Sequence, residues 1–134
     1  MLATAFFKSL PPLPNVEAEG PKTVASSGIL EVTLAYGVDN ATTAQETLTA
    51  LAPHCHGKNR RLLIDLRMVT DQSDGARLCY RHTLVHMAGP IAVVVGPNVS
   101  RFLGEFLVRE LRKHHNVKLF LNEERARVWL GGAE

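Results

Sequence analysis

The chain has 134 residues, of which 46% are hydrophobic and 21% are charged, a composition typical of one globular domain. Its net charge of +2 is too small to indicate binding to nucleic acid or to an anionic membrane. No apolar run approaches the roughly 20 residues that span a bilayer, and the apolar patch at the start is too short for a secretory signal. Cys55 and Cys79 do not make a disulfide framework. We therefore expect reduced thiols and a location in the cytoplasm.

The first 19 residues are expected to form an arm in front of the domain. Pro11, Pro12 and Pro14 each lack the backbone N–H that regular hydrogen bonding needs. The domain itself is predicted to begin near Gly20 and to comprise residues 20–134.

A β-hairpin is predicted at the start of the domain. Its strands cover residues 22–26 and about 29–36, and Gly28 can adopt the positive φ of the turn between them. Leu30, Val32 and Leu34 alternate along the second strand, so this apolar side should face the core.

The first helix is predicted from a capping box, Thr-Ala-Gln-Glu at residues 43–46, and should begin at Thr43. Pro53 and Gly57 bound its end. An apolar stripe along this helix should face the sheet. Its members are Ala44, Leu48, Leu51 and Ala52.

A short apolar strand, a polar break and an amphipathic helix then follow one another three times. The strands are expected at 62–66, 91–95 and 117–121. Near-continuous apolar strands that alternate with helices are typical of parallel strands joined by crossover helices. We therefore predict an α/β domain of order β-β-α-β-α-β-α-β-α. Its mixed five-stranded sheet is packed by helices, and the hairpin supplies the antiparallel edge.

Polar caps mark the starts of the three helices in these repeats. The first begins at Asp71 or Ser73 and ends before Gly89-Pro90, while Asn98 and Asn122 cap the other two. Gly104 should permit close packing of the middle helix on the sheet. The residues expected to face inward on the last two helices are Val99, Leu103, Phe106, Leu107, Leu111, Ala126, Trp129 and Leu130.

Four segments carry a resemblance to a known family. They are G-I-L-E-V-T at 28–33, L-L-I-D-L-R-M-V at 62–69, I-A-V-V-V-G-P-N-V-S at 91–100 and L-F-L-N-E-E-R-A-R-V-W-L at 119–130. With this order of elements, the chain resembles the STAS domain of bacterial anti-sigma-factor antagonists, and more closely the SpoIIAA-like group. The resemblance covers about residues 20–132 and implies the STAS-like fold.

The resemblance also implies a contact surface. STAS antagonists commonly carry a serine at the start of the helix after the third strand, and its phosphorylation switches partner binding. An ungapped alignment from Asp65-Leu66 puts that position at about Asp74 or Gly75, with the hydroxyls of Thr70 and Ser73 nearby. The residues expected to bind a partner or to act as a switch are Thr70, Asp71, Ser73, Asp74, Arg77 and Arg81, with His82 on the same helix.

Metal binding and catalysis have weaker signals in the sequence. Cys79, His82 and His86 share one helical face, as zinc ligands can, and residues 54–56 read His-Cys-His. No fourth ligand is evident, so both clusters are interpreted as chance, and we expect no metal and no cofactor. No catalytic motif is present around either cysteine. Asp65 is expected to be anchored by backbone amides of the next loop or by Arg67.

The predicted function is that of a non-enzymatic, STAS-like regulatory or protein-interaction module with an unidentified protein partner. A small apolar ligand is the alternative, because the SpoIIAA-like group is also similar in shape to CRAL-TRIO lipid-transfer domains. Met68, Leu78, Met87 and Phe106 would then line the cavity. Homodimer formation is left open, and nothing positive indicates an enzyme.

Overall fold

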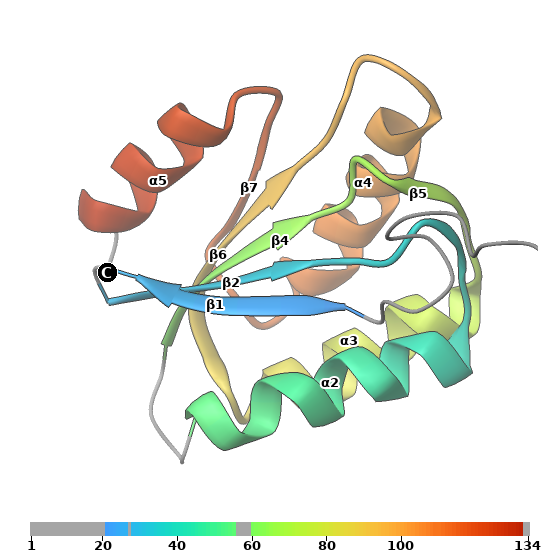
Figure 1. Ribbon diagram of the computed structural model, residues 1–134, viewed down its shortest axis with the longest axis horizontal. Helices are drawn as coiled ribbons and strands as arrows, with labels where there is room; N and C mark the ends of the chain where they lie inside the picture. Colours follow the sequence, from blue (N-terminus) through green and yellow to red (C-terminus); the bar gives the residue numbers. More distant parts are fainter. Residues whose placement is uncertain (1–20, 27, 56–59, 133–134) are drawn as a thin grey trace, which may run out of the picture.

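Five strands form one sheet at the centre of the computed structural model, which describes residues 21–26, 28–55 and 60–132 (Figure 1). They are β1 (Lys22–Ser26), β2 (Ile29–Thr33), β4 (Arg60–Asp65), β6 (Ala88–Val94) and β7 (Val117–Phe120). Their spatial order is β1-β2-β4-β6-β7. The pair β1–β2 is antiparallel, and the other neighbouring strands are parallel. The predicted mixed sheet, with a hairpin at one edge, is confirmed.

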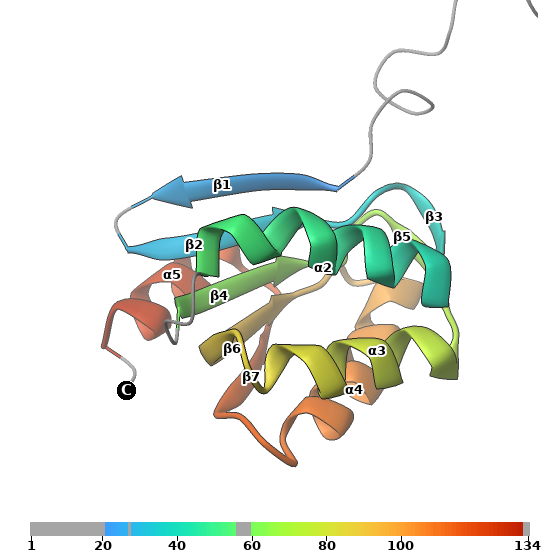
Figure 2. The same cartoon turned by 90° about the horizontal axis from the view of Figure 1, so that it is seen from below.

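Helices cover the two faces of this sheet unequally. The helices α2 (Ala41–Cys55), α3 (Asp74–Leu84) and α4 (Val99–Leu111) lie on one face, and α5 (Glu123–Gly132) lies alone on the other (Figures 1 and 2). Each face has its own core. Leu30, Val32 and Leu34 point into the larger core, as predicted, whereas Ile29 belongs to the smaller core beneath α5.

The helix caps follow the sequence with one exception. Ser73 and Asn98 accept hydrogen bonds at the starts of α3 and α4, and Asn122 does so at the start of α5. Thr43 does not cap α2. Instead, the Asn40 side chain accepts hydrogen bonds from the backbone N–H groups of Thr42 and Thr43, at 3.0 and 3.1 Å. The helix therefore begins two residues earlier than predicted, at Ala41.

Further boundaries differ from the prediction. The helix α2 continues through Pro53 to Cys55, and Ala52 is exposed although it was assigned to the apolar stripe. The strand β6 begins at Ala88, so Gly89-Pro90 lies within it rather than at the end of α3. The predicted arm, residues 1–19, lies outside the described residues.

Two short strands absent from the predicted order form a separate sheet. They are β3 (Gly37–Asp39) and β5 (Val69–Gln72), and they pair in parallel. Each has at most four residues, too few to give an apolar alternation that a sequence pattern can reveal. Both strands lie beyond the carboxyl ends of β2 and β4, and β5 leads directly into the cap of α3.

Two residues of α4 that were predicted to face the core are exposed. Leu103, Leu107 and Leu111 are buried as expected, but Val99 and Phe106 are each 48% exposed. The exposure of Phe106 follows from Gly104, at which a Cβ atom would lie 2.4 Å from Val95 Cγ1. With Gly104 against the sheet, a residue two positions away is rotated by about 200° around the helix and faces solvent.

The last helix buries Ala126 and Leu130, as predicted, and Trp129 packs against the same core but stays half-buried.

Among the helices in the described ranges, none combines the length and apolar character needed to cross a membrane.

Candidate partner-binding surface

The predicted contact residues lie together on β5 and the first two turns of α3. Thr70 and Asp71 belong to β5, Ser73 caps α3, and Asp74 begins the helix. Thr70, Asp71 and Asp74 are exposed, whereas Ser73 is half-buried. Together these positions form the β5–α3 surface, which consists of Thr70, Asp71, Ser73, Asp74, Arg77 and Arg81.

The buried carboxylate of Asp39 supports this surface from the protein interior. Asp39 of β3 is 4% exposed. Its Oδ2 accepts hydrogen bonds from Tyr80 Oη at 2.8 Å and from Gln72 Nε2 at 2.9 Å. Its Oδ1 accepts one from Thr43 Oγ1 at 2.6 Å. One carboxylate therefore joins β3, α2, β5 and α3, and hydrogen bonds between buried polar groups of this kind fix a local conformation. The Oε1 atom of Gln72 is buried without a hydrogen-bond partner among the described residues.

The same strand pairing sets the position of Ser73. The backbone carbonyl of Asp39 accepts a hydrogen bond from the Ser73 N–H at 3.0 Å. Burial, followed by the nearby Asp39 carboxylate, raises the pKa of Tyr80 above its ordinary value. The Tyr80 hydroxyl thus stays a neutral donor. This cluster could not be predicted from the sequence, because Gln72 and Tyr80 are far from Asp39 along the chain.

Ser73 and Arg77 both stabilise the first turn of α3. Ser73 Oγ accepts a hydrogen bond from the Ala76 N–H at 3.1 Å. Arg77 pairs with the carboxylate of Asp74, and its Nη1 donates to the Gln72 carbonyl at 3.1 Å. The guanidinium of Arg77 is therefore fixed in position, although its side chain retains 16% exposure.

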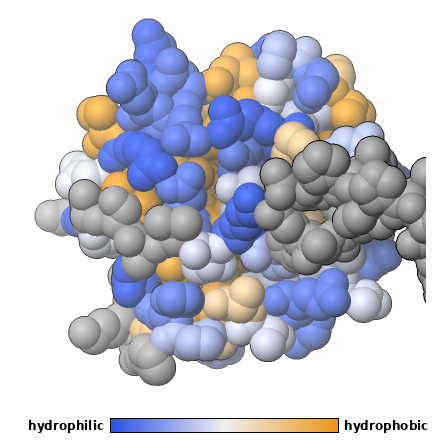
Figure 3. All heavy atoms as spheres, in the orientation of Figure 1, coloured by the Kyte–Doolittle hydropathy of each residue, from blue (hydrophilic) through white to orange (hydrophobic). Residues whose placement is uncertain are grey.

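An apolar stripe on α4 adjoins the β5–α3 surface. Phe102 is 63% exposed. The Arg77 guanidinium carbon lies 5.4 Å from the centre of the Phe106 ring, and that of Arg109 lies 5.6 Å from it. Figure 3 shows apolar side chains at the surface where α4 begins, at the upper right. This α4 stripe consists of Val99, Phe102 and Phe106.

Arg81 has a structural role between two helices. Its Nη1 donates to Glu110 of α4 at 2.7 Å, and Lys113 contacts the same carboxylate at 3.2 Å. The hydrogen bond from Arg81 lowers the pKa of Glu110 below its ordinary value. This contact ties α3 to α4 and keeps the β5–α3 surface beside the α4 stripe.

The Cys79, His82 and His86 side chains lie in the second half of α3 and just beyond it. Cys79 is half-buried, while His82 on α3 and His86 in the turn after it are exposed. In the described part of the chain, no three metal-binding side chains come together. His56, of the His-Cys-His segment, lies outside the described residues.

Two solved structures have a similar fold. One is an uncharacterized protein from the DUF3478 family with a SpoIIAA-like fold, from Shewanella loihica PV-4, with a TM-score of 0.61 and 17% identity. The other is an anti-sigma factor antagonist from Mycobacterium paratuberculosis, with a TM-score of 0.62 and 16% identity. Each alignment covers 83% of this chain and 92% of the other. The predicted SpoIIAA-like, STAS-type fold is thereby confirmed.

No curated protein matches the chain in sequence. A family model described as a domain of unknown function, DUF7793, matches residues 24–133. Because this match covers most of the 134 residues, the chain belongs to the DUF7793 family.

Proposed function

We propose that this protein is a non-enzymatic regulatory module of the bacterial cytoplasm that binds a partner protein through the β5–α3 surface and the α4 stripe. The observation that carries the proposal is Phe106, an aromatic ring that is 48% exposed and lies under two guanidinium groups. Exposed aromatic and arginine side chains are enriched among residues that dominate binding energy. The fold shared with an anti-sigma factor antagonist supports the same proposal.

The chemistry of this surface favours a partner segment that is both apolar and acidic. The α4 stripe would cover an apolar side chain of the partner. Arg109 forms no ion pair with any residue in the described part of the chain. Its stacking on Phe106 orders the guanidinium before binding, which lowers the entropic cost of pairing with a partner carboxylate.

Ser73 is the residue through which a switch would act. A phosphate there adds nearly two negative charges at the start of α3, where the helix dipole tolerates them. Asp71 and Asp74 already place carboxylates on the same loop. A third acidic group would repel an acidic partner without unfolding the domain.

The test begins with affinity capture and identification of a binding protein, followed by titration of the purified pair. Phe106→Ala should weaken the complex about tenfold or more, as loss of a central aromatic contact does. Val128→Ala is the matched control, since Val128 is 77% exposed on α5, on the other face of the sheet. Equal affinities for the two variants would refute the assigned surface.

The switch is tested with the same pair of proteins. Ser73→Asp should weaken binding relative to Ser73→Ala. Aspartate keeps an oxygen that can cap α3 and should melt near the wild-type temperature, whereas Ser73→Ala loses the cap and should be destabilised by about 1 kcal/mol. If the two bind equally well, the module binds its partner constitutively.

The apolar-ligand alternative receives less support from the geometry. Met68 and Leu78 are 47% and 44% exposed, and Phe106 lies on the surface with them. Met87 packs against the larger core. Native mass spectrometry of freshly purified protein distinguishes the two functions. A carrier would show the mass of the chain plus a bound lipid, and an interaction module would show the mass of the chain alone.

A further inference from the structure

The amino-terminal segment, residues 1–20, is joined to the domain at the end of the sheet that carries the β5–α3 surface. Lys22, the first residue of β1, pairs with Thr33, the last residue of β2. Because β2, β4 and β6 are parallel, their carboxyl ends lie at this same end of the sheet, and the chain continues from there into β5 and α4. Figure 2 shows the start of β1 at the same end of the molecule as β3, β5 and the starts of α2 and α3.

The amino-terminal segment is long enough to reach the α4 stripe. In the order of the strands, β1 and β6 are separated by β2 and β4, a distance of about 14 Å at roughly 4.8 Å per strand. The helix α4 follows β6 along the chain, and Phe106 lies about 10 Å beyond its first turn. Phe7 precedes Lys22 by about 15 residues, which can span up to about 50 Å.

The sequence of this segment matches the α4 stripe in its aromatic side chains. Of the five phenylalanines in the chain, Phe6 and Phe7 belong to the segment. Phe102 and Phe106 are 63% and 48% exposed on α4, and their spacing of four places them on one face of the helix. Aromatic rings pack favourably in offset or edge-to-face pairs. Two adjacent rings of the segment therefore suit the two exposed rings of the stripe.

The segment and the surface also match in charge. Lys8, directly after the phenylalanine pair, is the only basic side chain in the sequence of residues 1–20. Asp71 on β5 is exposed and forms no ion pair with another described residue. Arg77 connects it to the stripe, since its guanidinium donates to the backbone next to Asp71 and lies over the Phe106 ring. The surface thus has a carboxylate near its aromatic rings, and the segment has a lysine beside its own.

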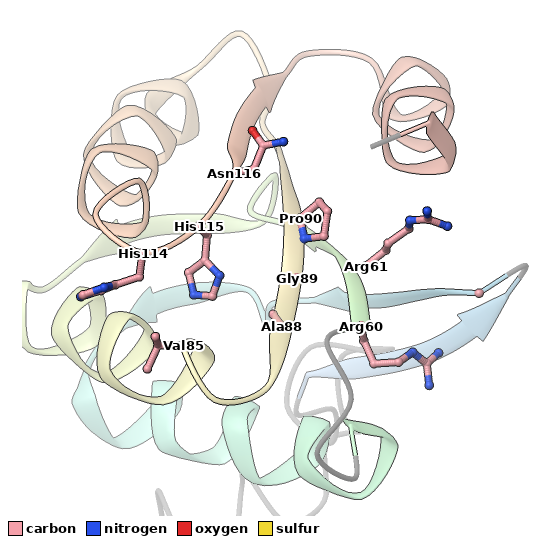
Figure 4. A pocket seen from close by; sticks show the side chains of 10 residues that line it. Arg60, Arg61, Val85, Ala88, Gly89, Pro90, His114, His115 and Asn116 are labelled. Carbon is pink, nitrogen blue, oxygen red and sulfur yellow. The ribbon is translucent and has the colours of Figure 1, made fainter. Parts of the chain in front are cut away.

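The pocket at the opposite end of the sheet does not match the segment in this way. It has a volume of about 650 Å³ and lies where β4 and β6 begin. Arg60 and Arg61 point away from each other there, and His114 and His115 lie on the other side of β6 (Figure 4). None of the described residues that line it is phenylalanine, tyrosine or tryptophan.

We propose that residues 1–20 bind the α4 stripe and the β5–α3 surface of their own chain, with Phe6 and Phe7 on the stripe and Lys8 beside Asp71. Because the contact is intramolecular, the segment acts at an effective concentration in the millimolar range. A contact with a dissociation constant of about 1 mM is then formed about half of the time, and the apparent affinity for a partner falls by the fraction of surface that is left free. The segment thereby regulates access to the surface. The inference rests on the proposed function for the role of this surface, but its first test needs no partner.

The test is nuclear magnetic resonance of the isotope-labelled full chain. Phe6→Ala/Phe7→Ala should shift the backbone signals of the α4 stripe, because the rings that cover it are removed. The signals of α5, on the other face of the sheet, should stay in place and verify folding. Ser9→Ala, in the same segment, should leave the α4 signals at their wild-type positions. Coinciding α4 signals in the wild type and the phenylalanine variant would overturn the proposal. An effect that disappears on dilution would also overturn it, because the segment would then bind a second copy of the chain.

A charge exchange locates the contact. Lys8→Glu should move the α4 signals toward their positions in the phenylalanine variant, and Lys8→Glu/Asp71→Lys should return them toward the wild type. Lys8→Glu/Glu124→Lys restores the same net charge with a lysine on α5 and should not return them. Equal return in both double variants would reduce the effect to net charge and overturn the assigned contact.

A captured partner protein then tests the regulation. Phe6→Ala/Phe7→Ala should tighten its binding at least twofold, whereas Phe106→Ala should weaken it. Unchanged partner affinity in the phenylalanine variant would overturn the regulatory role of the segment and leave the proposed function intact. If Phe106→Ala does not weaken the complex while the α4 signals still respond to the segment, the proposed partner surface fails and the intramolecular contact stands.

Discussion

The buried carboxylate of Asp65 binds both the backbone and the side chain of Arg67. Oδ1 accepts hydrogen bonds from the Arg67 backbone N–H at 2.9 Å and from Nε at 3.0 Å, and Oδ2 accepts one from Nη2 at 2.7 Å. The predicted anchoring of Asp65 by a loop amide and by Arg67 is confirmed. Arg67 Nη2 also donates to Glu123 at 2.8 Å, so the turn after β4 is tied to α5.

Asp65→Ala should destabilise the protein by about 2 kcal/mol, because charge-assisted hydrogen bonds contribute roughly 1.5–3 kcal/mol each and part of this network faces solvent. Chemical denaturation measures the change. Glu46→Ala, which removes an exposed carboxylate from α2, should change stability by less than about 0.5 kcal/mol. A similar loss in both variants would mean that burial of Asp65 is not the cause.

Gly104→Ala should destabilise the protein by about 1–3 kcal/mol, the usual cost of overpacking a core. The added Cβ would lie 2.4 Å from Val95 Cγ1 and 2.9 Å from Leu119 Cδ1, so α4 must move away from the sheet. Gly131→Ala on α5 is the control, since nothing lies within 4 Å of a Cβ there. If Gly104→Ala melts no lower than Gly131→Ala, α4 does not rely on this close contact.

The elements of the main sheet could be predicted because their signals are local. Buried parallel strands need continuous apolar runs, and the caps Ser73, Asn98 and Asn122 stand directly before their helices. The error at Phe106 was also avoidable from local geometry. A glycine at position 104 that touches the sheet and a buried Phe106 cannot both occur on one helix.

The cluster around Asp39 could not be predicted in the same way. It joins Thr43, Gln72 and Tyr80 to Asp39 across three other elements, and no local period reports such a tertiary contact. Asp39 and Gln72 of this cluster belong to the small sheet of β3 and β5, whose short strands also give no local signal. The contact residues Thr70 to Arg81 came from a family resemblance, and their role in binding stays a prediction.

Trp129→Ala should destabilise the protein by about 2–3 kcal/mol, at the low end for a large aromatic because the ring is half-buried. Its ring centre lies 5.7 Å from that of Phe120, and both pack against the core beneath α5. Val128→Ala, next to it on the exposed side of α5, should change stability by less than about 0.5 kcal/mol. Equal effects would place Trp129 outside the core.

Tyr80→Phe should destabilise the protein by about 1–2 kcal/mol, because it removes one donor from the buried carboxylate of Asp39 while it keeps the ring. Tyr36→Phe is the matched control, since Tyr36 is 61% exposed. Hydrogen exchange should also quicken at Ser73, whose amide bonds to the Asp39 carbonyl. Unchanged stability and exchange would mean that the network does not hold the β5–α3 surface.

Stability should fall at mildly acidic pH because of His115. Burial, in the first place, lowers the pKa of this ring below its ordinary value. The unfolded chain therefore binds a proton near pH 6.5 while the folded chain does not. The stabilisation from the neutral ring is present above pH 6.5 and is lost as the pH falls through the lower pKa of the folded state. A positive charge on the neighbouring His114 also lowers the pKa of His115, whereas the hydrogen bond to the Gly89 backbone raises it and opposes part of the effect.

His115→Asn should flatten this dependence. The free energy of unfolding, measured by denaturation between pH 7.5 and 5 in phosphate-free buffer, should decline less steeply in the variant than in the wild type. His82→Asn, which replaces an exposed histidine on α3, should keep the wild-type slope. Equal slopes for all three proteins would show that His115 titrates alike in the folded and unfolded chains.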